Sequence, residues 1–243
     1  MTRKALIISN PGEIGSENYC EGVNKDVVNY KNFLMSPQGG YWYENEIVCL
    51  NKPSSNLLEI HFNSLKNIDY SIIVFCGHGY SYKDETILEL NKDCDIYARS
   101  LKNSAKKRTI ILDCCRKNAE SINESLIHEF SSLIEKRAIN GIEARKYYEA
   151  LLSTCPDGTV VAYACDLNET AGDDSRKGGY YSYSLLQCAQ KWATQPTFSK
   201  SFQSIVSIHN QACVATREKS NNNQNPQIEK PRSTPYFPFV VRL

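Results

Sequence analysis

The sequence has no long hydrophobic run and no excess of charge of either sign. Its 243 residues contain no stretch of about 18 apolar residues and no charged segment followed by an apolar one, as a secretory signal would have. Lys and Arg total 28 against 27 Asp and Glu, so the net charge of +1 gives no reason to expect nucleic-acid or membrane binding. We therefore expect a soluble, cytoplasmic protein with neither of these partners.

Regular cysteine spacing is also missing, although the chain has ten cysteines. There is no C-x-x-C pair and no Cys/His spacing of the zinc type, so we expect no metal site. Cysteines scattered through apolar runs favour buried free thiols in a reducing compartment over disulfides. The cysteines in such runs are Cys49, Cys76, Cys165, Cys188 and Cys213. Three histidines fall in helical patterns and are expected to be ordinary surface or core residues: His61, His128 and His209.

A phosphate-binding loop is the third missing feature. Gly12 and Gly15 follow the first apolar run, but the third glycine of a dinucleotide fingerprint and the Gly-Lys-Ser/Thr of a P-loop are absent. This speaks against a flavodoxin-like or nucleotide-binding protein, and we expect no cofactor.

Short apolar runs alternate with amphipathic segments along the whole chain, without a convincing linker or internal repeat. This order predicts one α/β domain over residues 1–243, a three-layer sandwich with a mainly parallel, about six-stranded sheet flanked by helices. The expected strands are residues 4–9, 46–50, 71–76, 109–112, 159–164 and an edge-like 235–241. The expected helices are residues 20–35, one opened by Pro53, 96–106, 181–192 and 198–218.

Three further segments have their own expected character. Residues 117–152 read as a helical insertion with an apolar stripe that includes Ile122 and Phe130, and with a break at Asn140-Gly141. The acidic, glycine-containing stretch 165–180 is expected to be a mobile loop, and residues 220–234 an exposed one.

Reactive side chains follow two of the predicted strands. Gly77-His78-Gly79 ends one apolar run, and Asp113-Cys114-Cys115-Arg116 ends the next. If these strands are neighbours, their carboxyl ends meet at the edge where open α/β sheets carry their chemistry. A thiol within reach of an imidazole makes an activated nucleophile. Strand periodicity would send Cys114 to the same side as Leu112, but it is no guide beyond the strand end.

These two motifs resemble those of the caspase and metacaspase superfamily of cysteine proteases. Overlaying the metacaspase Asp-Ser-Cys motif implies Cys115 as the nucleophile, with Cys114 in place of the serine and His78 as the catalytic histidine. By the same resemblance, the backbone N–H groups of Cys115 and Gly79 form the oxyanion hole. The likeness extends to residues 21–26, 164–166 and 178–182, and so spans almost the whole chain.

Substrate specificity follows from the acids around the nucleophile. Asp26, Asp113 and Asp166 would line a pocket of negative charge, as in metacaspases, which suits an Arg or Lys side chain. The other implied substrate-binding residues are Cys76, Gly179 and Tyr180. A simpler alternative remains for two of the acids, since Asp26 could only support the start of its helix and Asp113 could only orient its loop.

Two possible forms of regulation, calcium binding and self-cleavage, can be considered from the sequence. Calcium dependence is doubtful, because the acids after the catalytic histidine show no EF-hand pattern; they are Asp84, Glu85, Asp93 and Asp95. Self-cleavage in the insertion is a hypothesis that rests on two basic pairs, which could equally be solvated surface charges; they are Lys136-Arg137 and Arg145-Lys146.

The sequence therefore predicts a cysteine endopeptidase that cleaves after Arg or Lys through a Cys–His dyad and a thioester acyl-enzyme. By family analogy it would act as an effector in cell death or antiviral defence, with a peptide or protein substrate and a small-molecule or protein activator. The alternative is a signalling or binding module with this fold and little or no proteolysis.

Overall fold

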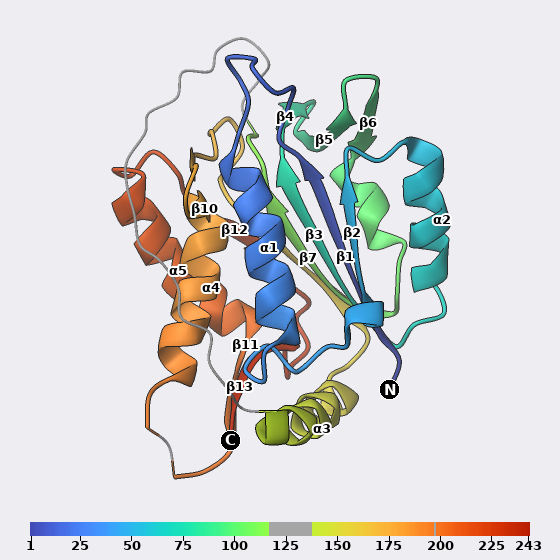
Figure 1. Ribbon diagram of the computed structural model, residues 1–243, viewed down its shortest axis with the longest axis vertical. Coiled ribbons are helices and arrows are strands. Elements are labelled where there is room, and N and C mark those ends of the chain that lie inside the picture. Colours follow the sequence, from blue (N-terminus) through green and yellow to red (C-terminus); the bar gives the residue numbers. More distant parts are fainter. Residues whose placement is uncertain (117–137, 197) are drawn as a thin grey trace.

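A six-stranded sheet forms the centre of the molecule. The computed structural model describes residues 1–116, 138–196 and 198–243, and orders the strands β12-β8-β7-β3-β1-β2 (Figure 1). Five of them are parallel: β1 (Arg3–Asn10), β2 (Ile47–Asn51), β3 (Tyr70–Gly77), β7 (Lys107–Asp113) and β8 (Gly158–Tyr163). The edge strand β12 (Gln227–Glu229) runs antiparallel to β8. The predicted mainly parallel α/β sheet is confirmed.

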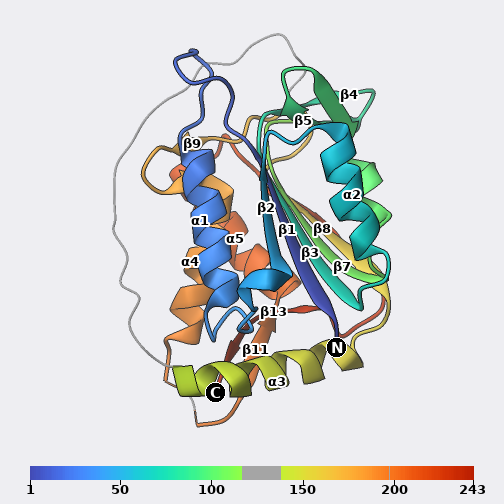
Figure 2. The ribbon, with the colours of Figure 1, turned by 45° about the vertical axis from the view of Figure 1, so that its right-hand side comes forward.

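Helices cover both faces of the sheet and one of its ends (Figures 1 and 2). One face carries α1 (Gly22–Met35), α4 (Tyr180–Ala193) and α5 (Ile205–Lys219). The other carries α2 (Ser55–Leu65) and the short 3-10 helix η2 (Ala98–Lys102). Helix α3 (Ala138–Thr154) lies across the end where the parallel strands begin, near the 3-10 turn η1 (Glu44–Glu46).

Alternation along the central strands builds two separate cores. Ile7 of β1 and Ile111 of β7 pack with α1, α4 and α5, whereas their neighbours Ile8 and Leu112 pack with α2 and η2. All four side chains are almost completely buried, with 0 to 1% of their surface exposed. Successive residues of a strand point to opposite faces, so a sheet covered on both sides needs apolar residues at every position. This is why these runs have no polar alternation.

Three smaller sheets decorate the central one. Strands β4 (Gly79–Tyr82), β5 (Glu85–Asn91) and β6 (Cys94–Tyr97) form an antiparallel sheet directly after β3. Strands β9 (Asp173–Asp174) and β10 (Gly178–Gly179) form a short hairpin, and β11 (Ser201–Ser204) pairs with β13 (Pro238–Arg242). The termini lie at the same end of the molecule as α3 (Figure 1).

The predicted helix over residues 96–106 is wrong. Its first residues belong to β6, in which Ile96 lies opposite Leu88, and only the turn of η2 follows. Likewise the predicted helix 198–218 begins with β11, and α5 starts only at Ile205. Ser204 separates the two, because its hydroxyl accepts a hydrogen bond from the N–H of Ser207 and caps α5.

The carboxyl-terminal segments also differ from the prediction. The strand expected at 235–241 pairs with β11 outside the central sheet, and the sixth strand of that sheet comes from the stretch expected to be an exposed loop. The stretch 165–180 contains the β9–β10 hairpin. Asn140-Gly141 does not break α3; it lies in its first turn, where Gly141 packs against the ring of Tyr41. The apolar stripe with Ile122 and Phe130 lies outside the described residues.

Candidate active site

The carboxyl ends of β3 and β7 bring the predicted dyad to one edge of the sheet. These strands are hydrogen-bonded neighbours, and their last paired residues are Cys76 and Asp113. His78 and Cys115 each stand two residues beyond that pair. This is the upper edge of the sheet in Figure 1, and it is the edge at which doubly wound sheets place their reactive groups.

The two adjacent thiols have different surroundings. Cys114 is 2% exposed and packs on the same face as Leu112, and burial raises the pKa of its thiol well above the ordinary value. A side chain at Gly79 would come within 3.0 Å of its Sγ, so β4 closes over it. Cys115 is only half-buried, and its Sγ lies 3.4 Å from both the N and the O of Ala171. Cys115 is therefore the thiol that a substrate could reach.

The imidazole of His78 sits against the loop that follows β1. A Cβ placed on Gly12 would lie 2.8 Å from its Nε2, and Gly12 has a φ of +85°, which favours glycine. This Nε2 is buried and has no hydrogen-bond partner among the described residues. The glycine loop that could have suggested a phosphate site thus leaves room for the histidine.

Two buried carboxylates lie beside the dyad on the face covered by α1 and α4. Asp26 of α1 accepts a 2.9 Å hydrogen bond from the N–H of Gly179, and Asp113 accepts one of the same length from the N–H of Ser182. Burial raises the pKa of Asp113 to about 6, with the nearby charge of Asp173 acting in the same direction. Burial and the charge of Asp113 raise the pKa of Asp26 well above its usual value.

The structure does not bring the third predicted acid to this pair. Asp166 is exposed, and its carboxylate accepts hydrogen bonds from the N–H of Leu167 and the side chain of Gln227 on the edge strand β12. Asp173 of β9 is the acid that acts on both buried carboxylates, and it accepts a hydrogen bond from the N–H of Gly22. Sequence reasoning missed Asp173, because only the hairpin fold selects it among the acids of this stretch.

The remaining predicted substrate residues lie close to the acid pair. Cys76 is fully buried beside it, and burial raises the pKa of its thiol well above the ordinary value, with the charges of Asp26 and Asp113 acting in the same direction. A side chain at Gly179 would collide with the carboxylate of Asp113, so this position requires glycine. The ring of half-buried Tyr180 packs against Gly172.

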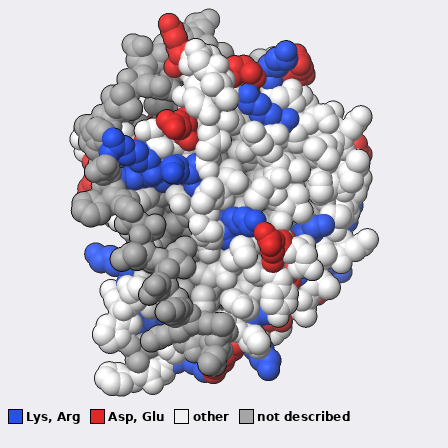
Figure 3. Space-filling view, in the orientation of Figure 1, with Lys and Arg blue, Asp and Glu red and all other residues white. Residues whose placement is uncertain are grey.

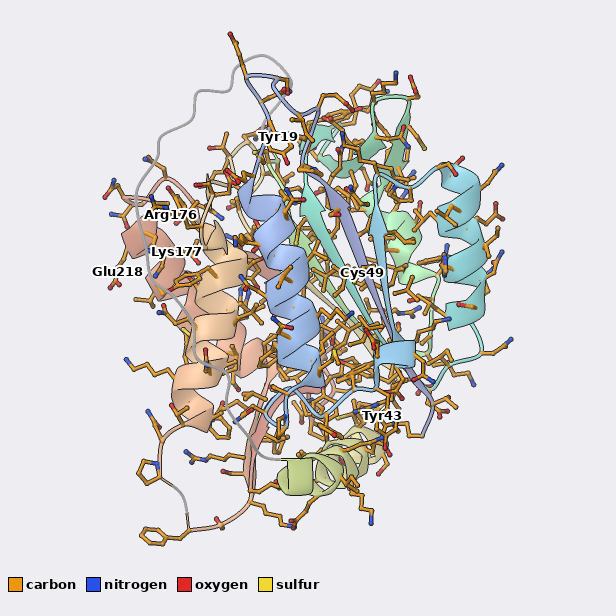
Figure 4. The ribbon with its side chains drawn as sticks, viewed as in Figure 1. Tyr19, Tyr43, Cys49, Arg176, Lys177 and Glu218 are labelled. Atoms are coloured by element: carbon orange, nitrogen blue, oxygen red, sulfur yellow. The ribbon has the colours of Figure 1, made fainter. Side chains whose placement is uncertain are left out.

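The β9–β10 hairpin closes over these carboxylates and is fixed from both sides. Asp174 holds its turn by accepting hydrogen bonds from the N–H groups of Arg176 and Lys177. Asn29 of α1 donates to the O of Lys177, whose ammonium lies 5.8 Å from the ring centre of Tyr183. Figure 4 shows Arg176 and Lys177 on the outer side of α4. The acid pair is thus covered by backbone in this structure.

Two of the four acids after His78 are engaged with other side chains. Glu85 pairs with Arg99, and Asp95 accepts a hydrogen bond from the hydroxyl of Tyr80. In the part of the chain that the structure describes, no three His, Cys, Asp or Glu side chains gather as a metal set. None of the ten cysteines, all of which lie in the described residues, forms a disulfide. Of the five in apolar runs, Cys76 and Cys165 are buried as expected, Cys188 and Cys213 are only half-buried, and Cys49 is exposed on the edge strand β2 (Figure 4).

Basic and acidic side chains are interspersed over a mostly uncharged surface on the face seen in Figure 3. None of the described helices is long and apolar enough to cross a bilayer.

Comparison with known proteins agrees with this arrangement. A family model described as the caspase domain matches residues 2–238, which is nearly the whole chain. No curated protein matches the sequence.

Proposed function

The chain belongs to the caspase family of cysteine peptidases, and we propose that it is an endopeptidase that cleaves peptide bonds after Arg or Lys. The observation that carries the specificity is the buried pair Asp26 and Asp113, because Asp113 lies two residues before the nucleophile on the same strand end. An acidic side chain of a substrate would be repelled there.

The acid pair is electrostatically incomplete. Buried carboxylates are normally neutralised by a cation, yet Oδ1 of Asp26 has no hydrogen-bond partner among the described residues. The raised pKa values mean that, without a cation, burial favours the protonated form of both carboxyl groups. A guanidinium or ammonium group supplies the missing charge and hydrogen bonds, and its binding would favour the ionised form of both carboxylates. Because Gly178 and Gly179 cover the pair, the β9–β10 hairpin must shift to admit the side chain.

The proposed reaction uses His78 and Cys115 as a dyad. The imidazole takes the proton of the thiol, and the thiolate sulfur attacks the scissile carbonyl carbon. Backbone N–H groups of Gly79 and Cys115 are expected to stabilise the oxyanion. The imidazolium then protonates the leaving amine, and water hydrolyses the thioester that remains on Cys115.

Hydrolysis of fluorogenic peptides ending in Arg, Lys, Asp or Ala tests this proposal directly. We expect turnover only after Arg and Lys, lost in Cys115→Ala and retained in Cys114→Ala, which is the matched control because it removes the adjacent thiol. Cleavage after Asp would overturn the acidic pocket while leaving the dyad in place. Activity that survives in Cys115→Ala would overturn the nucleophile.

The alternative function is a binding module with this fold and weak or no proteolysis. The presence of both dyad residues at one edge of the sheet favours the peptidase. Inactivity towards every peptide, together with a failure of Cys115 to react with a peptidyl electrophile that carries Arg, would favour the binding module. A role in cell death or defence, and control by an activator, stay predictions.

The two basic pairs predicted as self-cleavage sites lie in different parts of the chain. Arg145-Lys146 lies within α3, where the guanidinium of Arg145 makes two 2.7 Å contacts with Glu46. Cleavage there would require unfolding of this part of the helix, because a protease binds its substrate as an extended chain. Lys136-Arg137 lies outside the described residues.

A further inference from the structure

A closed ring of hydrogen bonds fixes the backbone around the catalytic histidine. The N–H of His78 donates to the O of Asn10 (3.3 Å), and the N–H of Glu89 donates to the O of His78 (3.1 Å). The side-chain amide of Asn10 closes the ring by donating to the O of Glu89 (2.8 Å). The other end of the same amide accepts the N–H of Gly12, which shapes the turn against the imidazole. Asn10 is buried, so this ring is shielded from water.

The ring places Glu89 on the same side of the small sheet as His78. Gly79 of β4 lies opposite Leu88 of β5, so the preceding residue, His78, lies opposite Glu89. Directly opposite residues of an antiparallel pair point to the same face, with Cβ atoms about 5 Å apart. The carboxylate of Glu89 is half-buried and has no hydrogen bond or ion pair within the described residues. Burial raises its pKa, and the charge of His78 acts in the opposite direction.

The other charged groups around the imidazole are occupied elsewhere. On the loop after β1, Glu13 is paired with Lys52 at 2.8 Å. On the small sheet, Asp95 accepts the hydroxyl hydrogen bond of Tyr80. The end of β7 contributes the nucleophile itself. Among the described residues, Glu89 is thus the carboxylate left to act on the imidazole.

We propose that Glu89 is a positioning residue of the dyad, which stabilises the imidazolium form of His78 and is fixed opposite it by Asn10. This inference rests on the proposed peptidase function, in which the proton moves from Cys115 to His78. The positive imidazolium formed in that step is then stabilised by a nearby negative charge in a partly water-excluded place. The Cys–His dyad would in this way have an acidic third group supplied by the small sheet.

Protonation of His78 can be measured without any substrate. Imidazole NMR signals are titrated in a Cys115→Ala background, which leaves all three hydrogen bonds between Asn10, His78 and Glu89 in place. We expect Glu89→Gln to lower the midpoint of His78 protonation by about half to one pH unit, since the two side chains are cross-strand neighbours at a half-buried site. Asp95→Asn on the same face is the matched control and should shift the midpoint by less than about a third as much.

A charge-conserving variant and the active enzyme complete the test. Glu89→Asp should restore most of the midpoint shift, and in the active enzyme Glu89→Gln should move the acidic limb of the kcat/KM profile to lower pH without changing KM. An unchanged midpoint in folded Glu89→Gln, or equal shifts in Glu89→Gln and Asp95→Asn, would overturn the assignment. Absence of peptidase activity with the expected NMR shift would contradict the proposed function and leave the electrostatic pairing intact.

Discussion

Gly12 gives the sharpest test of how His78 is held. In Gly12→Ala the new methyl group would lie 2.8 Å from Nε2 and 3.4 Å from Cδ2 of the imidazole. Ordinary contacts between such atoms are about 3.5 Å or longer, so the ring must move by roughly 0.7 Å. A displacement near 1 Å in a catalytic group can cost about a hundredfold in rate. We therefore expect kcat to fall by about 30- to 100-fold.

The same loop offers a matched control in Gly15. Its φ is +86°, almost equal to the +85° of Gly12, but no atom lies within 4 Å of a Cβ built there. Alanine should therefore cost each position about 1 kcal/mol of backbone strain, whereas only Gly12→Ala should reduce kcat. Peptide hydrolysis and urea unfolding of both variants separate the two effects. Equal kcat values in the two variants would refute the view that Gly12 seats the histidine.

Further predictions follow from the buried charges and thiols. Because burial raises the pKa of Asp113 to about 6, KM for an Arg substrate should fall as pH rises through that value, and Asp113→Asn should abolish this dependence; initial rates measured against pH check it. The ionisation of Asp113 lowers the stability of the fold between pH of about 4 and 6, so Asp113→Asn should not unfold more easily than the parent protein at pH 7, as urea titration would show. Cys114→Ala should lower the free energy of unfolding by about 1 to 2 kcal/mol and leave kcat/KM within about threefold, whereas a larger loss of activity would mean that this thiol takes part in the reaction. Glu46→Gln should cost about 2 to 4 kcal/mol in thermal or urea unfolding with KM unchanged, because it removes one of the carboxylates beside the buried guanidinium of Arg3.

The central sheet and its reactive edge could be predicted from the sequence for a physical reason. A parallel strand with helices packed on both faces needs a continuous apolar run, and polar residues follow where the strand extends beyond these helices. The runs before His78 and Cys115 obey this rule, and the neighbouring strands of a parallel sheet bring their carboxyl ends together. To predict that β3 and β7 are neighbours, it was therefore enough to assume a single crossover connection between them, and they are neighbours in the sheet.

Antiparallel pairings, both local and distant, were harder to predict. Ile96 was expected to begin a helix over residues 96–106, but β5 offers it a strand partner in Leu88. The edge strand β12 comes from a stretch rich in Asn, Gln and Pro, and it pairs with β8 more than 60 residues earlier. Local composition carries no information on such partners, since strand preference depends on the neighbour that a segment finds.

The prediction of Asp166 as the third acid of the pocket was wrong for a related reason. Asp166 and Asp173 lie in one acidic stretch, and only the β9–β10 hairpin decides which of them faces α1. Asp166 follows β8 directly and stays with the edge strand at Gln227. A resemblance of short motifs could locate the pocket, but the fold of this loop was needed to select its third carboxylate.

The end of β7 shows how three consecutive residues acquire three different tasks. Asp113 shares the α1 and α4 face with Ile111, so its carboxylate joins the acid pair. Cys114 points to the opposite face with Leu112, where β4 closes over its sulfur. Cys115 lies beyond the last residue of β7 that pairs with β3, and its side chain is part of neither hydrophobic core. The adjacent thiol is therefore no reserve nucleophile: in Cys115→Ala the buried sulfur of Cys114 has a raised pKa and no route to a peptide carbonyl.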